Sequence, residues 1–152
     1  MDRLARLEAI EAIRALKARY FRLIDTKAWD ELPDVFTPDL QVITPEGAIY
    51  AEGGDTYASS LAHSLGDAVS CHQGLTAEIE IVDEDQARAV WAMQDIITWS
   101  HAHPRTGWKS IHGCGHYHES CRRCTDGAWR MSRLQLTRLR LDVTWPEGRS
   151  PA

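Results

Sequence analysis

The chain has 152 residues, of which 43% are hydrophobic and 26% are charged, and its formal net charge is −5 at pH 7. This size and apolar fraction predict one domain around one core and exclude a disordered chain. The negative charge argues against nucleic acid or an anionic membrane surface as a partner, and no apolar run approaches the ~20 residues of a membrane-spanning helix.

The N-terminal third predicts three helices. Apolar residues recur at helical spacing over 4–25, with Asp2 as the N-cap. Asp25 lies at the C-terminal end of this helix, where an acid opposes the helix dipole, so we expect it to serve something other than helix stability. The pattern then predicts a short helix over 28–36, a hairpin of 40–44 and 48–52 around Pro45-Glu46-Gly47, and a helix over 56–65 capped by Asp55.

The remainder alternates apolar and polar residues as strands do. We predict strands over 75–81, 87–100, 109–124 and 129–144, with a hairpin turn at Asp126-Gly127 and a bulge near Ser132-Arg133. The expected fold is therefore α+β: a curved antiparallel sheet, mostly a C-terminal meander, closed by three N-terminal helices. Residues 1–145 form the single domain, and 146–152 are a loose tail.

One face of the 87–100 strand carries an acid among large apolar residues. Asp95 shares that face with Trp91, Met93, Ile97 and Trp99. If the face points inward, Asp95 is buried and needs a charged or hydrogen-bonding partner. The alternative is a paired and inert acid at the rim of the sheet. In the last strand Arg138 shares a face with Leu134 and Leu136, which fits either an inward anion-binding arginine or a solvated edge residue.

The histidines are harder to orient from the sequence. His72 has the parity of Glu78 if the strand after it is regular, but Gly74 offers a bulge that would reverse its face. His112, Cys114, His116 and His118 alternate onto one face and are the main zinc candidate. Same-face neighbours on one strand lie about 7 Å apart, however, so a polar face with one or two pocket histidines is favoured.

The cysteines give a weaker signal. Cys121 and Cys124 form a C-x-x-C pair, but no second pair accompanies it and it does not open a helix. We therefore interpret the four cysteines as reduced residues of a sheet in a cytoplasmic protein. The charged, periodic N-terminus does not look like a signal peptide, which agrees with a cytoplasmic location.

Three segments together resemble the SnoaL-like branch of the nuclear transport factor 2-like superfamily. They are residues 18–39 (ARYFRLIDTKAWDELPDVFTPD), residues 78–95 (EIEIVDEDQARAVWAMQD) with His72 ahead of them, and residues 113–142 (GCGHYHESCRRCTDGAWRMSRLQLTRLRLD). The resemblance implies a cone-shaped fold with a deep apolar pocket and a homodimer or homotrimer. Within the family the motifs are most similar to three lyases: bile-acid 7α-dehydratase, scytalone dehydratase and hexachlorocyclohexane dehydrochlorinase.

The resemblance also implies roles for individual residues. Tyr20, Asp25, His72 and Asp95 match the Tyr, Asp, His and second Asp of the bile-acid dehydratase pattern, and its late Arg falls on Arg138, with Arg133 as the alternative. Asp25 would orient His72 as the base, since an imidazole beside a carboxylate is well suited to proton abstraction at neutral pH. The expected substrate-binding residues are Trp91, Met93, Ile97 and His116.

The resulting hypothesis is a lyase without metal or organic cofactor that acts on a small hydrophobic, ring-bearing substrate. Isomerisation or cyclisation with the same acid–histidine pair stays open, and so does a non-catalytic member that only binds a small ligand.

Overall fold

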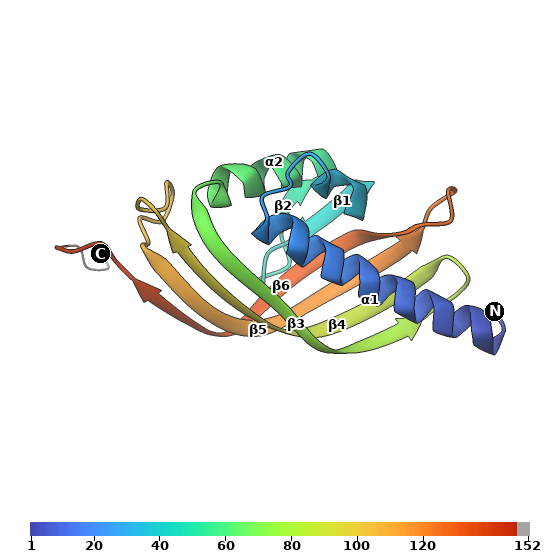
Figure 1. The fold of residues 1–152 in the computed structure, drawn as a ribbon. Coiled ribbons are helices and arrows are strands. Elements are labelled where there is room, and N and C mark those ends of the chain that lie inside the picture. The colour runs from blue at the N-terminus through green and yellow to red at the C-terminus, as the bar shows by residue number, and fades with distance from the viewer. Residues whose placement is uncertain (149–152) are drawn as a thin grey trace.

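The computed structural model describes residues 1–148. In this part of the chain two α-helices, α1 (Arg3–Asp25) and α2 (Gly54–Leu65), lie over the concave face of one curved sheet (Figure 1). The six strands are β1 (Phe36–Ile43), β2 (Ile49–Glu52), β3 (Ala68–Ile81), β4 (Gln86–Trp99), β5 (Ser110–Arg123) and β6 (Trp129–Thr144). Neither helix of residues 1–148 has the length and apolar character needed to cross a lipid bilayer.

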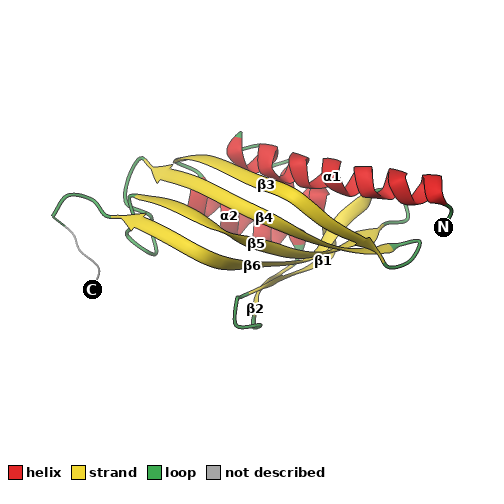
Figure 2. Ribbon diagram, turned by 90° about the horizontal axis from the view of Figure 1, so that it is seen from below, coloured by secondary structure: helices red, strands yellow, loops and turns green. Residues whose placement is uncertain are grey.

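The strand order across the sheet is β2-β1-β6-β5-β4-β3 (Figure 2). Strands β3 to β6 form the predicted antiparallel meander. The expectation of a wholly antiparallel sheet is wrong at one place, because β1 pairs with β6 in parallel. The hairpin of β1 and β2 therefore extends the meander at its last strand, and the sheet remains open at β2 and β3.

The prediction of three helices is also wrong. Where a helix over 28–36 was expected, the chain has only a 3-10 turn, η1 (Leu32–Val35), and Phe36 already begins β1 beside Met131. Leu32 and Val35 are completely buried, so their spacing reflects one turn packed into the core and not a longer helix. Pro38, which has no N–H to donate, falls where the pairing of β1 with β6 is irregular.

Helix α2 starts slightly earlier than predicted. Its N-cap is Gly53, whose φ of 89° is readily adopted by glycine, and Asp55 lies in the first turn instead of capping it. A Cβ atom on Gly54 would lie 2.9 Å from Phe36 Cβ, so glycine here lets the helix start pack directly on β1.

Strand β3 begins well before the predicted residue 75 and includes His72. The irregularity that sets its face is at Thr76, with a φ of 28°, between Leu75 and Ala77 in the pairing with β4. Gly74 serves a different purpose: a Cβ atom there would lie 2.6 Å from the Phe21 ring of α1. The bulge at Thr76 puts His72 and Ile79 on the same, helix-covered face.

The inner face of the sheet holds the core. On β4 the predicted apolar face points inward, and Trp91, Met93, Ile97 and Trp99 are all buried. Two bulges in β6 change which residues point inward: Ser132 is the extra residue between the partners of Ser120 and Cys121, and Leu139 is the extra residue further along. Strand β6 ends at Thr144, shortly before the predicted tail of residues 146–152, and residues 149–152 of that tail lie outside the described residues.

Candidate active site

Asp25 is the last residue of α1, and a tight turn follows it. The N–H of Ala28 donates to the carbonyl of Leu23 (2.9 Å), and the N–H of Lys27 donates to that of Ile24 (3.2 Å). These two bonds are those of a Schellman motif, in which glycine is preferred at the position occupied by Lys27. Lys27 has a φ of 62°, and this left-handed conformation costs a non-glycine residue about 1–2 kcal/mol.

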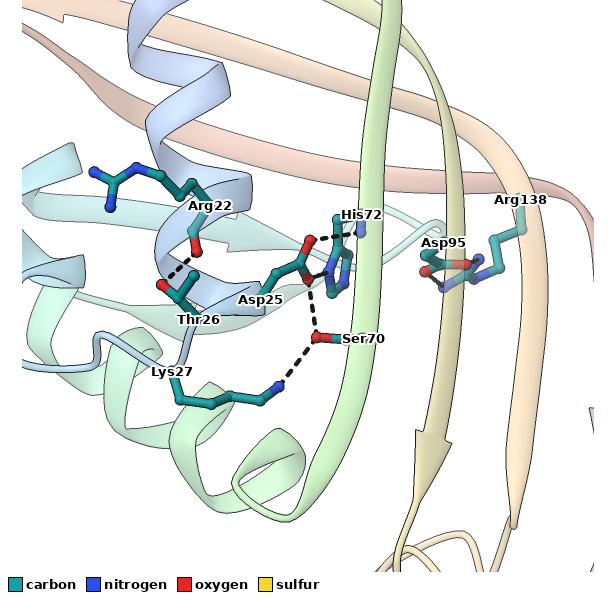
Figure 3. A network of polar contacts seen from close by, with 8 residues as sticks. All are labelled: Arg22, Asp25, Thr26, Lys27, Ser70, His72, Asp95 and Arg138. Atoms are coloured by element: carbon teal, nitrogen blue, oxygen red, sulfur yellow. Dashed lines mark hydrogen bonds and ion pairs between the residues drawn. The ribbon is translucent and has the colours of Figure 1, made fainter.

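The Asp25 carboxylate is held by three donors from β3 (Figure 3). His72 Nδ1 lies 2.7 Å from Asp25 Oδ1, the backbone N–H of His72 donates to Oδ2 at 2.9 Å, and Ser70 Oγ donates to Oδ1 at 2.8 Å. The structure therefore brings Asp25 and His72 together as expected. These bonds explain why an acid is tolerated at the C-terminal end of a helix.

The local environment keeps Asp25 ionised. Burial opposes ionisation, but the hydrogen bonds from His72 and Ser70 outweigh it, and the pKa of Asp25 is lowered from its usual value. An ionised carboxylate only accepts hydrogen bonds, so Nδ1 of His72 must carry a proton and donate it. In the neutral imidazole the lone pair is then on Nε2, which has no hydrogen-bond partner among the described residues.

His72 is packed firmly in this orientation. Its side chain is 7% exposed, and the Phe21 ring stacks on it with 8° between the planes and 6.3 Å between the centroids. A restrained ring with a free Nε2 lone pair has the features of a general base.

Asp95 and Arg138 form a second pair beside the first. Asp95 is the cross-strand partner of His72 on the inner face, and both of its oxygens accept from Arg138, from Nη1 at 2.9 Å and from Nη2 at 2.6 Å. Asp25, His72, Asp95 and Arg138 come from α1, β3, β4 and β6 and thus lie in a row, in which Arg138 reaches over β5 to Asp95 (Figure 3). Arg133, the alternative arginine, is exposed in a separate polar groove.

Gly113 makes room for this second pair. A Cβ atom on Gly113 would lie 2.0 Å from Arg138 Nη1 and 2.6 Å from Asp95 Oδ1. Burial lowers the pKa of Arg138, but its bonds to Asp95 outweigh this and the net shift is upward. The sequence reasoning missed Gly113, although a glycine inside a strand is a known sign of close approach.

Tyr20 is buried in the core and is 2% exposed. Its ring packs edge-on against those of Phe36 and Tyr117. Burial raises the pKa of Tyr20 well above its usual value and raises that of Tyr57 to about 12. Both phenols are therefore neutral hydroxyl groups that can donate a hydrogen bond.

An apolar cavity of about 310 Å³ adjoins Arg138. Its lining comes from β1, β2, α2, β5 and β6, and includes Val42, Ile43, Tyr50, Tyr57, Tyr117, Leu134 and Leu136. The expected lining residues Trp91, Met93 and Ile97 share the inner face with Asp95 but are buried in the core beside this cavity, not around it.

His116 was expected with these residues, and this placement is wrong. His116 pairs with Ala92 and Thr137 on the outer face of the sheet, opposite to Asp95. His112, Cys114 and His118 share that outer face, where strand geometry spreads them apart. Among residues 1–148 no three His, Cys, Asp or Glu side chains converge closely enough to hold a metal ion.

A buried charged cluster was missed by the sequence reasoning. Lys17 forms an ion pair with Glu119, which also accepts from Trp91 Nε1 at 3.0 Å. The Lys17 ammonium lies 3.6 Å from the centroid of the Tyr117 ring and 4.5 Å from that of Phe21. Burial lowers the pKa of Lys17, and Glu119 opposes this shift. The signal was available, because Lys17 falls on the apolar face of α1.

Several known proteins resemble this chain in sequence or in fold. Over 144 residues the chain is 27% identical to "Probable cyclase FGR4" of Gibberella zeae, covering 87% of this chain and 92% of the relative. A candidate scytalone dehydratase from Novosphingobium aromaticivorans has a structure 21% identical in sequence, with a TM-score of 0.77 and coverage of 97% and 98%. The hexachlorocyclohexane dehydrochlorinase LinA-type3 from Novosphingobium barchaimii is 18% identical, with a TM-score of 0.75 and coverage of 99% and 100%.

At these identities the solved structures show the fold alone, an open, curved α+β sheet covered by helices. The family is shown by a more direct match. The SnoaL-like domain matches residues 5–135, and the chain belongs to this family, as the resemblance indicated.

Proposed function

We propose that this protein is a lyase that needs no cofactor and eliminates a leaving group from a small hydrophobic, ring-bearing substrate. One observation carries the proposal: Nδ1 of His72 donates to an ionised Asp25, so that the lone pair of the neutral ring is on Nε2. The dehydratase and dehydrochlorinase among the similar structures support this reaction class.

The proposed step begins with proton transfer to His72. Nε2 takes a proton from a carbon next to a carbonyl or similar electron-withdrawing group, and Asp25 stabilises the imidazolium that forms. The electrons of the broken C–H bond form a carbon–carbon double bond as the leaving group departs with its bonding pair. The imidazolium then returns the proton to the leaving oxygen, so that an alcohol substrate releases water.

Arg138 and Tyr20 would stabilise the charge that develops. A guanidinium has five N–H groups, and Asp95 engages two of the Arg138 donors, so others remain for an oxyanion on the cavity side. The neutral Tyr20 hydroxyl would bind a carbonyl or the leaving oxygen. The apolar walls, including Leu134 and Leu136, would exclude water and hold the rings of the substrate.

Isomerisation or cyclisation with the same residues is the second candidate. The curated relative that is named a cyclase favours it. The two reactions share the proton abstraction and differ in the product, because elimination lowers the mass of the substrate by that of the leaving group, whereas isomerisation leaves it unchanged.

Proton abstraction is tested by incubating ring-bearing β-hydroxy ketones and enones with the protein in deuterated water and following exchange and product mass. We expect His72→Ala to lose about 10²- to 10⁴-fold in rate, and Asp25→Asn to lose activity because an amide can favour the opposite tautomer. His112→Ala, on the outer face, is the matched control. Equal exchange in wild type and His72→Ala would refute the base, and tight binding without turnover would indicate the non-catalytic alternative.

A further inference from the structure

A second layer of polar groups lies behind the Asp25–His72 pair. Ser70 Oγ lies 2.8 Å from Asp25 Oδ1, and Lys27 Nζ lies 3.0 Å from Ser70 Oγ (Figure 3). We infer that Ser70 and Lys27 are positioning residues, which fix the Asp25 carboxylate and through it keep the lone pair of His72 on Nε2. The catalytic meaning of this layer rests on the function proposed above.

The chemistry of the three groups fixes the direction of both hydrogen bonds. A lysine ammonium has donors and no acceptor, so Ser70 Oγ must accept from Lys27. The single hydroxyl proton of Ser70 then points toward Asp25, whose carboxylate accepts the hydrogen bond. Proton donation therefore runs in one direction, from Lys27 through Ser70 to Asp25.

Ser70 completes the set of donors around Asp25. Oδ1 accepts from both Ser70 and Nδ1 of His72, while Oδ2 accepts from the backbone of His72. The Asp25 side chain is 22% exposed, so without Ser70 water would compete for Oδ1. A carboxylate held from three directions cannot rotate away from the imidazole, and the protonated Nδ1 is thereby maintained.

The backbone at Lys27 gives an independent reason to assign its side chain a role. Lys27 occupies the left-handed position of the Schellman motif, where glycine would avoid the strain. Strain at one residue beside a polar cluster points to a function for that residue. Burial lowers the pKa of Lys27, and its charged neighbours Asp25 and Asp67 oppose this shift by favouring the charged form of the side chain.

Substitutions can separate positioning from folding. Ser70→Ala removes the donor to Asp25, and Ser70→Thr retains a hydroxyl as the conservative rescue. Lys27→Gly removes the ammonium while relieving the backbone strain, so we expect its thermal midpoint to stay the same or rise. Arg3→Gln, at the far end of α1, controls for the loss of one positive charge.

The readouts are the nitrogen-15 shifts of the His72 ring, a carbon-13 titration of the Asp25 carboxyl, and the exchange kinetics. For Ser70→Ala and Lys27→Gly we expect an increased share of the tautomer protonated on Nε2. Because the hydrogen bond from Ser70 helps to lower the pKa of Asp25, we expect Ser70→Ala to raise that pKa. Each variant should lower kcat about tenfold with KM nearly unchanged, since neither residue lines the cavity.

Each outcome decides a different point. Wild-type His72 and Asp25 signals in folded Ser70→Ala and Lys27→Gly would overturn the positioning roles. Altered signals restored by Ser70→Thr would support them, even if no wild-type exchange is found. If the signals are altered and restored but wild type catalyses no exchange, the proposed function is wrong, whereas the positioning roles of Ser70 and Lys27 are supported.

Discussion

The space above Gly113 allows a quantitative prediction about the second ion pair. In Gly113→Ala the new Cβ atom would overlap Arg138 Nη1 at 2.0 Å and Asp95 Oδ1 at 2.6 Å, so the bidentate pair cannot keep its geometry. Arg138 is 25% exposed and can move its guanidinium toward solvent, whereas Asp95 is 3% exposed and cannot follow. A buried carboxylate is then left without its partner.

Leaving one member of a buried pair uncompensated costs about 3 kcal/mol. For a domain of this size, that cost lowers the thermal midpoint by about 6–12 °C. Urea unfolding of wild type and Gly113→Ala measures the difference directly, with an unchanged slope as the sign that both proteins unfold in the same way.

A mutant cycle identifies the cause of this loss. In an Asp95→Ala, Arg138→Ala background, adding Gly113→Ala should cost less than about 1 kcal/mol, because the pair is already gone. If Gly113→Ala is as stable as wild type, or if it lowers the free energy of unfolding equally in the wild-type and the double-alanine backgrounds, then Gly113 does not serve the ion pair.

Three further predictions concern other parts of the molecule. Lys17→Met should destabilise the protein by about 3–5 kcal/mol in urea unfolding, and adding Glu119→Gln, whose amide oxygen can still accept from Trp91 Nε1, should recover most of that loss, since the unpaired buried charge is then removed. His103 Nδ1 accepts hydrogen bonds from the backbone N–H groups of Arg105 and Thr106. Burial lowers the pKa of His103, the charges of Arg105 and His63 lower it further, and Asp67 opposes this shift. The folded state favours the neutral His103, so the stability that this residue contributes should be complete above pH 6.5, the usual pKa of histidine, and should be lost as the pH falls below it. In a series of thermal midpoints from pH 5 to 8, His103→Asn should depend less on pH than wild type. The expected dimer or trimer remains a prediction: Leu139→Asp, at a 76% exposed residue of β6, should shift sedimentation toward the monomer, and an unchanged profile would exclude Leu139 from the interface.

Local patterns were sufficient to predict the meander and its inner face. Alternation over 87–100 correctly put Asp95 among buried apolar residues, because strand side chains alternate strictly while the pairing is regular. The face of His72 could not be derived in this way, since it depends on the bulge at Thr76, a residue with no glycine-like signature. His116 lies opposite to the buried Ile111 and Tyr117 on a regularly alternating strand, so local alternation was sufficient to place it on the outer face.

The N-terminal elements were predicted less well for a related reason. The turn of Leu32 to Val35 has helical spacing, but tertiary contacts decide that Phe36 starts a strand. The parallel pairing of β1 with β6 joins segments far apart in the sequence, and no local pattern predicts it. Lys17 and Glu119 could each be recognised as charged residues on apolar faces, but not as partners.

The pairing of β1 with β6 also has a consequence for the order in which the molecule assembles. Val42 lies beside Leu134 in the sheet and both line the cavity, so the wall of the cavity joins residues separated by most of the chain. The Asp25–His72 contact closes a much shorter loop and costs less entropy. During synthesis the base and its acid can meet while β6 is still being made, whereas the cavity that would hold a substrate, together with Arg138, is completed only when the last strand arrives.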